Sequence, residues 1–457
     1  MDLERIRSNM FKTICRFSIP AIIAMVLTSL ITIADGFFTG NYVGKEGIAA
    51  INLGLPIVYL YLGVGLMISV GGSALASMAL GAGDKDKGNA IFNQTMFTTV
   101  LISFAVSLMA WISFQPLLNI LHVNDQVANY FQGYYTIMLV ELPILVINNA
   151  FGMFIRGEGN PQFFMKNSAL NVLGNIILDY LFAGRLHMGI EGIAMASLLS
   201  SCICLIFILR YFVLRSNIYK FHKFIFVKET LKSTIFNGSS EFIGEISMSI
   251  TMFAYNWVIM MNIGVDGLTA FTIVGYISYL FSMIIIGFGQ GVSPLISFSY
   301  GAQEKELAKS LRRKTNFCVL GAGIFVISAM SILSNWYSDI FVKSENVKGM
   351  IQSGLFIFMI SFLFSGINTI TTFYFASIGK AKESATISAL RGLLILLICI
   401  FTLPVIFGMT GVWLVAPITE AITIPISIYF IIKNDLTIKT KENSVIEERR
   451  SVNVTSR

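Results

Sequence analysis

Two carboxylates, Asp35 and Asp179, lie deep inside long apolar stretches of the sequence. Asn175 precedes Asp179 by four residues, and this spacing places both side chains on one face of a helix. Ionisable side chains are costly inside a bilayer, so they mark candidate ion or proton sites. A hard cation such as Na⁺ prefers oxygen ligands, and a carboxylate can instead take up a proton. We therefore predict a Na⁺ or proton site formed by Asp35, Asn175, Asp179, Ser197 and Asn149.

The same polar residues have a purely structural interpretation. Buried carboxylates and amides can hydrogen-bond one another simply to fix the orientation of helices. This alternative stays open at this stage, above all for Asn148 and Asn149.

The second half of the chain carries three further acids within apolar stretches, Glu241, Glu245 and Glu420. Glu241 and Glu245 are one helical turn apart and therefore share a face. Of two neighbouring carboxylates, one can hold a proton and release it when a cationic compound arrives. We predict that these acids bind substrate or protons; the alternative is a solvated, inactive Glu241 near a helix end. Methionine and aromatic residues at 248–257 would suit varied apolar cations, although such side chains more often face lipid or other helices.

The elements that position these residues must lie in a membrane. Of the 457 residues, 55% are hydrophobic and only 12% are charged, whereas a soluble domain has about 25% charged residues. The mean hydropathy is +0.75. The net charge of +7 does not indicate nucleic-acid binding, because the basic residues lie in short linkers between apolar stretches. The lipid bilayer is therefore the expected partner, and the five cysteines are expected to be free.

A membrane helix needs about 20 apolar residues, and twelve stretches qualify. They lie at 17–40, 54–80, 91–114, 127–151, 166–183, 191–213, 233–261, 269–298, 315–335, 351–376, 385–407 and 411–432. Of the 32 Lys and Arg residues, 28 lie on one side of this arrangement. By the positive-inside rule, that side and both termini are cytoplasmic.

The sequence repeats itself at one constant offset between its two halves. YVGKEGIAA at 42–50 matches NIGVDGLTA at 262–270, GGSALASMALGAG at 71–83 matches GVSPLISFSYGAQ at 291–303, and MGIEGIA at 188–194 matches a segment near Phe407 with a shift of one position. Two six-helix halves in the same orientation are related by a pseudo-two-fold axis along the membrane normal. We predict an all-α membrane protein of twelve transmembrane helices, with an N-terminal lobe at 1–213, a cytoplasmic linker at 214–232, a C-terminal lobe at 233–432 and a disordered cytoplasmic tail at 433–457.

Several motifs give the chain a specific resemblance. They are Pro20 with Asp35, GAGDKDKGNA at 81–90, IRGEGNPQ at 155–162, NIILDY at 175–180, GIEGIAMAS at 189–197, GQGVSPLISFSYGA at 289–302 and ASIGKAKES at 376–384. With them the sequence resembles a multidrug and toxic compound extrusion (MATE) transporter of the bacterial DinF-like branch, over nearly the whole chain to about residue 432.

The resemblance implies export of small, often cationic organic compounds in exchange for Na⁺ or H⁺, by a monomer in the bacterial cytoplasmic membrane. It implies that Asp35, Asn175, Asp179 and Ser197 match the family's cation site, where threonine is usual in place of serine. Some family members use an aspartate in the tenth span, and this chain has none there. We further predict that Pro20 is a hinge, because proline removes a helix hydrogen bond.

Two other functions fit part of this pattern. A lipid-linked oligosaccharide flippase shares the plan, but it would be expected to line its cavity with arginines, and here only Arg391 lies near a span. A membrane-embedded enzyme is disfavoured because the sequence offers no catalytic constellation, and its three histidines all lie in linkers. We expect no cofactor other than the coupling ion.

Overall fold

The computed structural model describes residues 3–120, 125–222 and 225–455. All regular elements within these residues are helical. The elements are α1 (Leu3–Ser8), α2 (Met10–Tyr42), α3 (Lys45–Gly81), α4 (Lys85–Ile120), α5 (Asp125–Glu158), α6 (Pro161–Asp179), the π-helix η1 (Tyr180–Arg185), α7 (Gly189–Leu214), α8 (Lys228–Asn237), α9 (Ser239–Asn262), α10 (Val265–Gly301), α11 (Lys305–Phe341), α12 (Glu345–Ile357), the 3₁₀-helix η2 (Phe358–Ile360), α13 (Ser361–Ser377), α14 (Ala381–Ala389), the π-helix η3 (Leu390–Leu394) and α15 (Ile395–Thr455).

Each of the twelve predicted apolar stretches lies within one helix or a run of adjoining helices. Nine segments of the described chain are long and apolar enough to cross a membrane. Helices α6 and α9 are not among these nine segments, because their polar residues lower their hydropathy. Some of those polar residues are candidate site residues. The last of the nine, at 381–437, contains two legs separated at Gly408, whose φ of 57° interrupts the helix. Twelve crossings remains a prediction.

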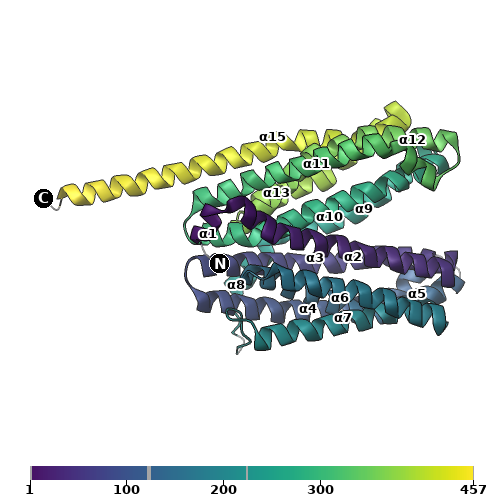
Figure 1. Cartoon of the computed structure of the whole chain (residues 1–457), viewed down its shortest axis with the longest axis horizontal. Helices are drawn as coiled ribbons and strands as arrows, with labels where there is room; N and C mark the ends of the chain where they lie inside the picture. Colours follow the sequence, from purple (N-terminus) through teal and green to yellow (C-terminus); the bar gives the residue numbers. More distant parts are fainter. Residues whose placement is uncertain (1–2, 121–124, 223–224, 456–457) are drawn as a thin grey trace.

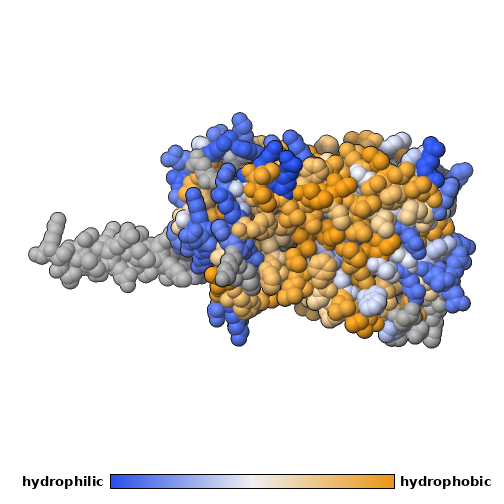
Figure 2. Space-filling view, turned by 90° about the horizontal axis from the view of Figure 1, so that it is seen from below, coloured by the Kyte–Doolittle hydropathy of each residue, from blue (hydrophilic) through white to orange (hydrophobic). Residues whose placement is uncertain are grey.

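The helices form two lobes that lie side by side (Figure 1). The first lobe contains α2 to α7 and the second contains α9 to α15, and the two chain ends lie at the same end of the molecule (Figure 1). On the face seen in Figure 2, apolar residues cover the middle of the molecule and hydrophilic residues gather at both ends. An apolar surface of this extent needs lipid rather than water around it, so the chain is a multi-pass membrane protein.

The internal repeat is visible in the backbone. Left-handed turns occur in pairs at the repeat offset: Gly44 with Gly264, Gly83 with Gln303, and Gly159 with Gly379. Gly189 pairs with Gly408, with the same shift of one position that the sequence shows. The positive φ that these turns require is the reason glycine recurs there.

The two lobes touch closely where α3 and α10 end. A Cβ atom added to Gly81 would lie 2.0 Å from the main-chain oxygen of Phe298, and one added to Gly301 would lie 2.0 Å from that of Met78. The repeat relates these two contacts to each other, so the pseudo-two-fold axis passes between them. Only glycine permits such close backbone approach, and the lobes are therefore closed against each other at the end that carries both termini.

Helix α15 continues into the segment for which composition predicts a disordered tail. Composition predicts disorder after residue 432, whereas the backbone is helical as far as Thr455 and projects away from the bundle (Figure 1). Residues 456–457 lie outside the described residues. The segment is rich in Lys, Glu and Arg, which favour helix, and it continues a helix that has already formed, so it avoids the cost of nucleation.

Candidate ion and substrate site

The predicted ion-site residues of the first lobe come together from three helices. The side-chain amide of Asn175 on α6 donates to the Ser197 hydroxyl on α7 at 3.1 Å, and that hydroxyl donates to Asp35 Oδ2 on α2 at 3.4 Å. The carboxyl groups of Asp35 and Asp179 lie within hydrogen-bonding reach of each other. Asn175 and Asp179 are fully buried, and Ser197 is 5% exposed.

Four oxygen atoms of this cluster are buried and accept no hydrogen bond from any described residue. They are Asp35 Oδ1, Asn175 Oδ1 and both carboxylate oxygens of Asp179. Buried polar atoms in proteins nearly always have a partner, and unpaired buried charge is strongly unfavourable. Oxygen acceptors that converge without donors are suited to a bound cation or to protons.

Local helix geometry is irregular next to this cluster. Helix α6 ends at Asp179 and continues as the π-helix η1. Single π-turns are frequent at functional sites because they rotate the following side chains out of the α-helical register. On α2, the hydroxyl of Thr39 donates to the main-chain oxygen of Asp35 at 2.6 Å.

A second polar group lies in the same lobe. Ser201 donates its hydroxyl to Glu141 Oε1 at 2.9 Å, and its main-chain oxygen accepts from the Asn148 side chain at 3.0 Å. Glu141 is 3% exposed and its Oε2 has no donor among the described residues. Asn148, rather than the predicted Asn149, therefore joins the buried network. Asn149 is half-buried and makes no side-chain hydrogen bond within the described part of the chain.

The second lobe does not repeat the ion site. At the positions that the repeat relates to Asp35 and Asp179 stand Tyr255 and Cys399, both buried and neither carrying a carboxylate. One neighbouring hydrogen bond is nevertheless present in both lobes. Asn148 donates to the main-chain oxygen of Ser201, and its counterpart Asn368 donates to the main-chain oxygen of Glu420 at 3.0 Å. The two lobes thus share a backbone contact but differ in the chemistry placed beside it.

Glu420 is not brought together with the other two predicted second-lobe acids. It forms an ion pair with Arg391 at 2.5 Å, and it accepts a 2.7 Å hydrogen bond from the Asn368 side chain. Arg391 also donates to Thr369 at 2.6 Å. Glu420 therefore has its partners within its own lobe.

Glu241 and Glu245 lie on α9, where both are half-buried. The side chain of Glu245 packs against Gly63 of α3 in the other lobe, where an added Cβ would lie 3.3 Å from its own. Tyr59 of α3 and Tyr279 of α10 lie near Glu245. The repeat relates these two tyrosines, so they flank the pseudo-two-fold axis. Glu245 thus faces the boundary between the lobes.

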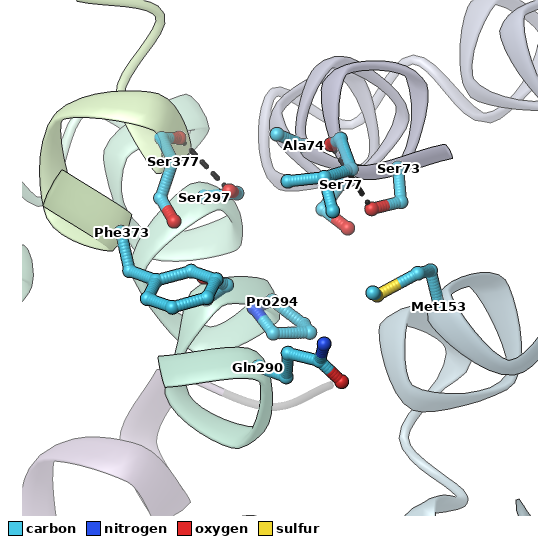
Figure 3. Close-up of a pocket in the computed structure, with 11 residues that line it drawn as sticks. Ser73, Ala74, Ser77, Met153, Gln290, Pro294, Ser297, Phe373 and Ser377 are labelled. Carbon is cyan, nitrogen blue, oxygen red and sulfur yellow. Dashed lines mark hydrogen bonds between the residues drawn. The ribbon is translucent and has the colours of Figure 1, made fainter. Parts of the chain in front are cut away.

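A small cavity of about 10 Å³ lies on the same axis, toward the closed end (Figure 3). It is lined by pairs of residues that the repeat relates, such as Ser73 with Ser293 and Ser77 with Ser297. Its volume is at the lower limit for one water molecule. The two lobes therefore leave almost no space between them at this depth.

Arg156 bridges the lobes beside this cavity, and sequence reasoning did not find it. Its guanidinium donates to Gln290 Oε1 of α10 at 3.1 Å and lies over the ring of Phe164, 4.7 Å from the centroid. The residue is 1% exposed, and its Nε and Nη1 have no partner among the described residues. The sequence signal that could have identified Arg156 is its position in the motif IRGEGNPQ, at the polar end of an apolar stretch.

Pro20 is buried within α2, which remains one continuous helix through it. The residues on either side of it pack on the second lobe: Ser18 against Gly291 and Ile22 against Gly287 of α10. Asp35, further along the same helix, belongs to the first-lobe cluster. Helix α2 thus contacts both lobes, with Pro20 at the contact with the second.

A family model described as MatE matches residues 20–181 and 242–402, once in each half of the chain. The chain belongs to the MatE family. This confirms the resemblance found in the motifs, although the DinF-like branch within the family remains a prediction.

Among relatives of this MatE chain, the multidrug export protein MepA of Staphylococcus saprophyticus is 24% identical over 448 residues, which is 95% of this chain and 97% of the relative. A solved outward-facing MATE family transporter of the MOP superfamily superimposes with a TM-score of 0.89 at 22% identity, covering 94% of this chain and 96% of its own. A MATE structure in a bent conformation gives a TM-score of 0.88 at 23% identity, covering 96% and 98%. These structural similarities cover nearly the whole chain, so they support the two-lobe fold for the entire helix bundle.

In this MatE chain, the candidate ligands for an alkali cation are of more than one chemical type. Within the described residues, no group of three or more His, Cys, Asp or Glu side chains is placed to hold a metal. A Na⁺ site would have to combine the carboxylates of Asp35 and Asp179 with the amide oxygen of Asn175 and the hydroxyl of Ser197. These are the neutral and anionic oxygen ligands that hard cations prefer.

Proposed function

We propose that this protein exports small, often cationic organic compounds and drugs across the bacterial cytoplasmic membrane, in exchange for Na⁺ or H⁺ moving inward. The observation that carries the proposal is the group of four buried oxygens without donors at Asp35, Asn175 and Asp179. The name of the relative MepA, a multidrug export protein, supports the direction of transport and the substrate class.

The coupling step follows from what a cation does to this cluster. Two neighbouring carboxylates, of which only Asp35 Oδ2 accepts a hydrogen bond, repel each other, and a bound Na⁺ or proton removes the repulsion. The cluster is shared by α2, α6 and α7, so binding draws these helices together. A ligand shifts a conformational equilibrium only by its differential affinity for the two states, and the cation supplies that difference.

Helix α2 transmits the change to the second lobe. Its first part packs on α10 around Pro20, and Asp35 lies about four turns further along. Because Pro20 lacks an N–H, the helix bends there at lower cost than elsewhere. Movement of Asp35 would therefore alter the contact of α2 with Gly287 and Gly291, and with it the relative position of the lobes.

The substrate site that we propose lies at the lobe boundary, at Glu245 with Tyr59 and Tyr279. A carboxylate with two tyrosine side chains nearby suits an organic cation. On the same helix Met248 and Met252 are 41% and 48% exposed, one and two turns beyond Glu245, and methionine adapts to varied shapes. We keep Glu241 as a second acid of this surface and leave Glu420 out, because Arg391 already neutralises it.

The same pairing weakens the flippase alternative. A flippase is expected to line its central cavity with arginines that are free to bind a pyrophosphate, and Arg391 is engaged by Glu420 and Thr369. Arg156 is enclosed at the lobe boundary with its Nη2 on Gln290. The exporter is therefore the better supported function.

Dye transport tests the proposal. Inverted membrane vesicles containing the protein are loaded with Na⁺ or acidified inside, so that each gradient drives an exporter separately. We expect dye to accumulate with at least one gradient, and not in vesicles carrying the Asp35→Asn variant. Failure of both gradients to drive uptake, with protein present at normal levels, would contradict coupled export.

Orientation is tested independently. We propose that both termini are cytoplasmic, so a reporter fused near Lys220 should lie inside the cell and one near Asp266 outside. The linker around Lys220 is rich in basic residues, whereas the turn before Asp266 has none, and basic linkers stay in the cytoplasm. Reporters that fall on one side would overturn the arrangement of two parallel lobes.

A further inference from the structure

A cavity of about 380 Å³ opens at the end of the molecule that carries both termini. Four segments form it: α1, the start of α2, the turn between α5 and α6, and α10. Its size falls within the range of small-molecule binding sites. It is separate from the ion cluster and from the lobe boundary at Glu245, since it shares no lining residue with either.

The charged residues of this cavity are unbalanced. Arg5 and Arg16 line it, and neither has a carboxylate within 4 Å among the described residues, whereas the neighbouring Arg7 pairs with Glu304 at 2.7 Å. Glu158 also lines the cavity. Its two carboxylate oxygens already accept hydrogen bonds from the Tyr211 and Ser216 hydroxyls and from the amides of residues 217 and 218, at 2.7–2.9 Å.

Two unpaired guanidinium groups suit a phosphate. Arginine presents its donors in a planar fork that matches the oxygens of phosphate, often in bidentate fashion. Thr13, which also lines the cavity, adds a hydroxyl donor from the same helix as Arg16. The charge and the donor types therefore indicate an anionic ligand with several acceptor oxygens.

The rest of the surface is apolar. The cavity wall includes Ile6, Phe17 and Leu295, which are at most 5% exposed. Along α2, Arg16 is followed on the same face by Ile19 and Ile23, which are 51% and 41% exposed. These lie at i+3 and i+7 from Arg16, so they form one stripe that leads from the guanidinium toward the apolar middle of the molecule. A ligand that fits both parts carries an anionic head and an apolar chain.

We propose that this cavity binds the phosphate group of an anionic phospholipid, with Arg5 and Arg16 on the phosphate and an acyl chain along the exposed stripe of α2. Basic pockets at the cytoplasmic side of membrane helices are suited to such head groups. The wall joins first-lobe residues to Leu295 of the second lobe, so the lipid would hold the two lobes together at their closed end.

Lipid binding by the purified full-length protein tests the proposal. We measure retention of phosphatidylglycerol by native mass spectrometry, with phosphatidylcholine and inorganic phosphate in parallel arms. Each lost arginine should weaken phosphatidylglycerol binding about fivefold, on the scale of basic residues near a membrane surface. The variant with both Arg5→Gln and Arg16→Gln should therefore lose about 25-fold. Lys12→Gln is the matched control, because Lys12 is exposed on the same helix and does not line the cavity.

Three outcomes would overturn the assignment. Unchanged phosphatidylglycerol binding by the double variant would remove the site. An equal loss of phosphatidylglycerol binding in the Lys12→Gln variant would mean that the lipid responds to the general positive charge of this surface and not to a defined site. Displacement of the lipid by inorganic phosphate at equal concentration would assign the cavity to a free anion. Because both arginines are exposed, the double variant should keep the wild-type melting temperature in phosphatidylcholine, so that a loss of binding is not a loss of fold.

Discussion

Replacing Asp179 by asparagine keeps the size of the side chain and removes one of the two charges available to a cation. Two unit charges about 4 Å apart interact by about 4 kcal/mol at an effective dielectric constant of 20. Because about 1.4 kcal/mol corresponds to tenfold in affinity, Asp179→Asn should weaken cation binding by roughly a thousandfold. Asp35→Asn should act similarly, because both carboxyl groups belong to the same cluster and lie within hydrogen-bonding reach of each other.

Neutral ligands of the cluster should have smaller effects. Ser197→Ala removes one uncharged oxygen, which is worth about 1 kcal/mol or roughly fivefold. Glu141→Gln keeps an oxygen that can accept the hydrogen bond from Ser201, so it should be milder than either aspartate variant. This gradation distinguishes an ion site from a network that merely orients helices, in which charge would not be the deciding property.

Stability provides a readout that does not depend on transport. Both oxygens of Asp179 are buried without donors, so the neutral variant should fold at least as stably as the wild type when no cation is bound. The wild type should gain about 2.7 kcal/mol at a cation concentration of about 100 times Kd, and the variant should not. The assay is thermal unfolding against NaCl at constant ionic strength and against pH, with efflux measured at matched expression.

Asp125→Asn is the control for charge removal, because Asp125 is an exposed acid at the start of α5. It should keep both the cation-dependent stabilisation and the transport rate. If Asp35→Asn and Asp179→Asn both pump at the wild-type rate, the first-lobe cluster is structural. Coupling must then be sought at Glu241 and Glu245.

Three further predictions concern the framework. Pro20→Ala should express normally but slow efflux, because it restores the hydrogen bond whose absence lets α2 bend; an unchanged rate would exclude a hinge. Gly301→Ala should destabilise the protein by about 1–3 kcal/mol through overpacking between the lobes, whereas Gly321→Ala, in open space on α11, should not, as measured by thermal unfolding. Arg391→Met should cost about 3–5 kcal/mol because it leaves Glu420 buried and unpaired, and adding Glu420→Gln should restore much of that loss; no recovery would mean that the ion pair is not the cause.

Much of the fold was predictable because lipid imposes strict rules on sequence. Apolar length located the helices, and the internal repeat indicated the two lobes. The turns at Gly44 and Gly264 adopt the same left-handed conformation, as identical residues at equivalent positions should. The disordered tail stays a prediction: composition favours disorder after residue 432, while α15 continues as a helix to Thr455.

The ion cluster was only partly predictable. Spacing placed Asn175 and Asp179 on one face, but no pattern says which of two adjacent asparagines points inward, since neighbours on a helix differ by about 100° in direction. Asn148 joins the neighbouring group of Glu141 and Ser201, and Asn149 makes no side-chain hydrogen bond within the described residues. Likewise Arg391 lies in η3 and Glu420 lies in α15, 29 residues further along the chain. Their pairing depends on tertiary packing, which composition and periodicity do not encode.

On the proposed coupling, the presence of Tyr255 and Cys399 in place of both aspartates in the second lobe would limit how much work a cycle can do. With one such site occupied by one monovalent cation, a single ion would cross per turnover. Such an ion releases about 2.3 kcal/mol across about 100 mV, and a tenfold concentration gradient adds about 1.4 kcal/mol. Together these sustain an outside-to-inside ratio of roughly 400 for a neutral compound exchanged one for one. A duplicate site in the other lobe would square that ratio, so the divergence of the two halves lowers the steepest drug gradient that a cell could maintain while halving the number of ions that enter with each exported molecule.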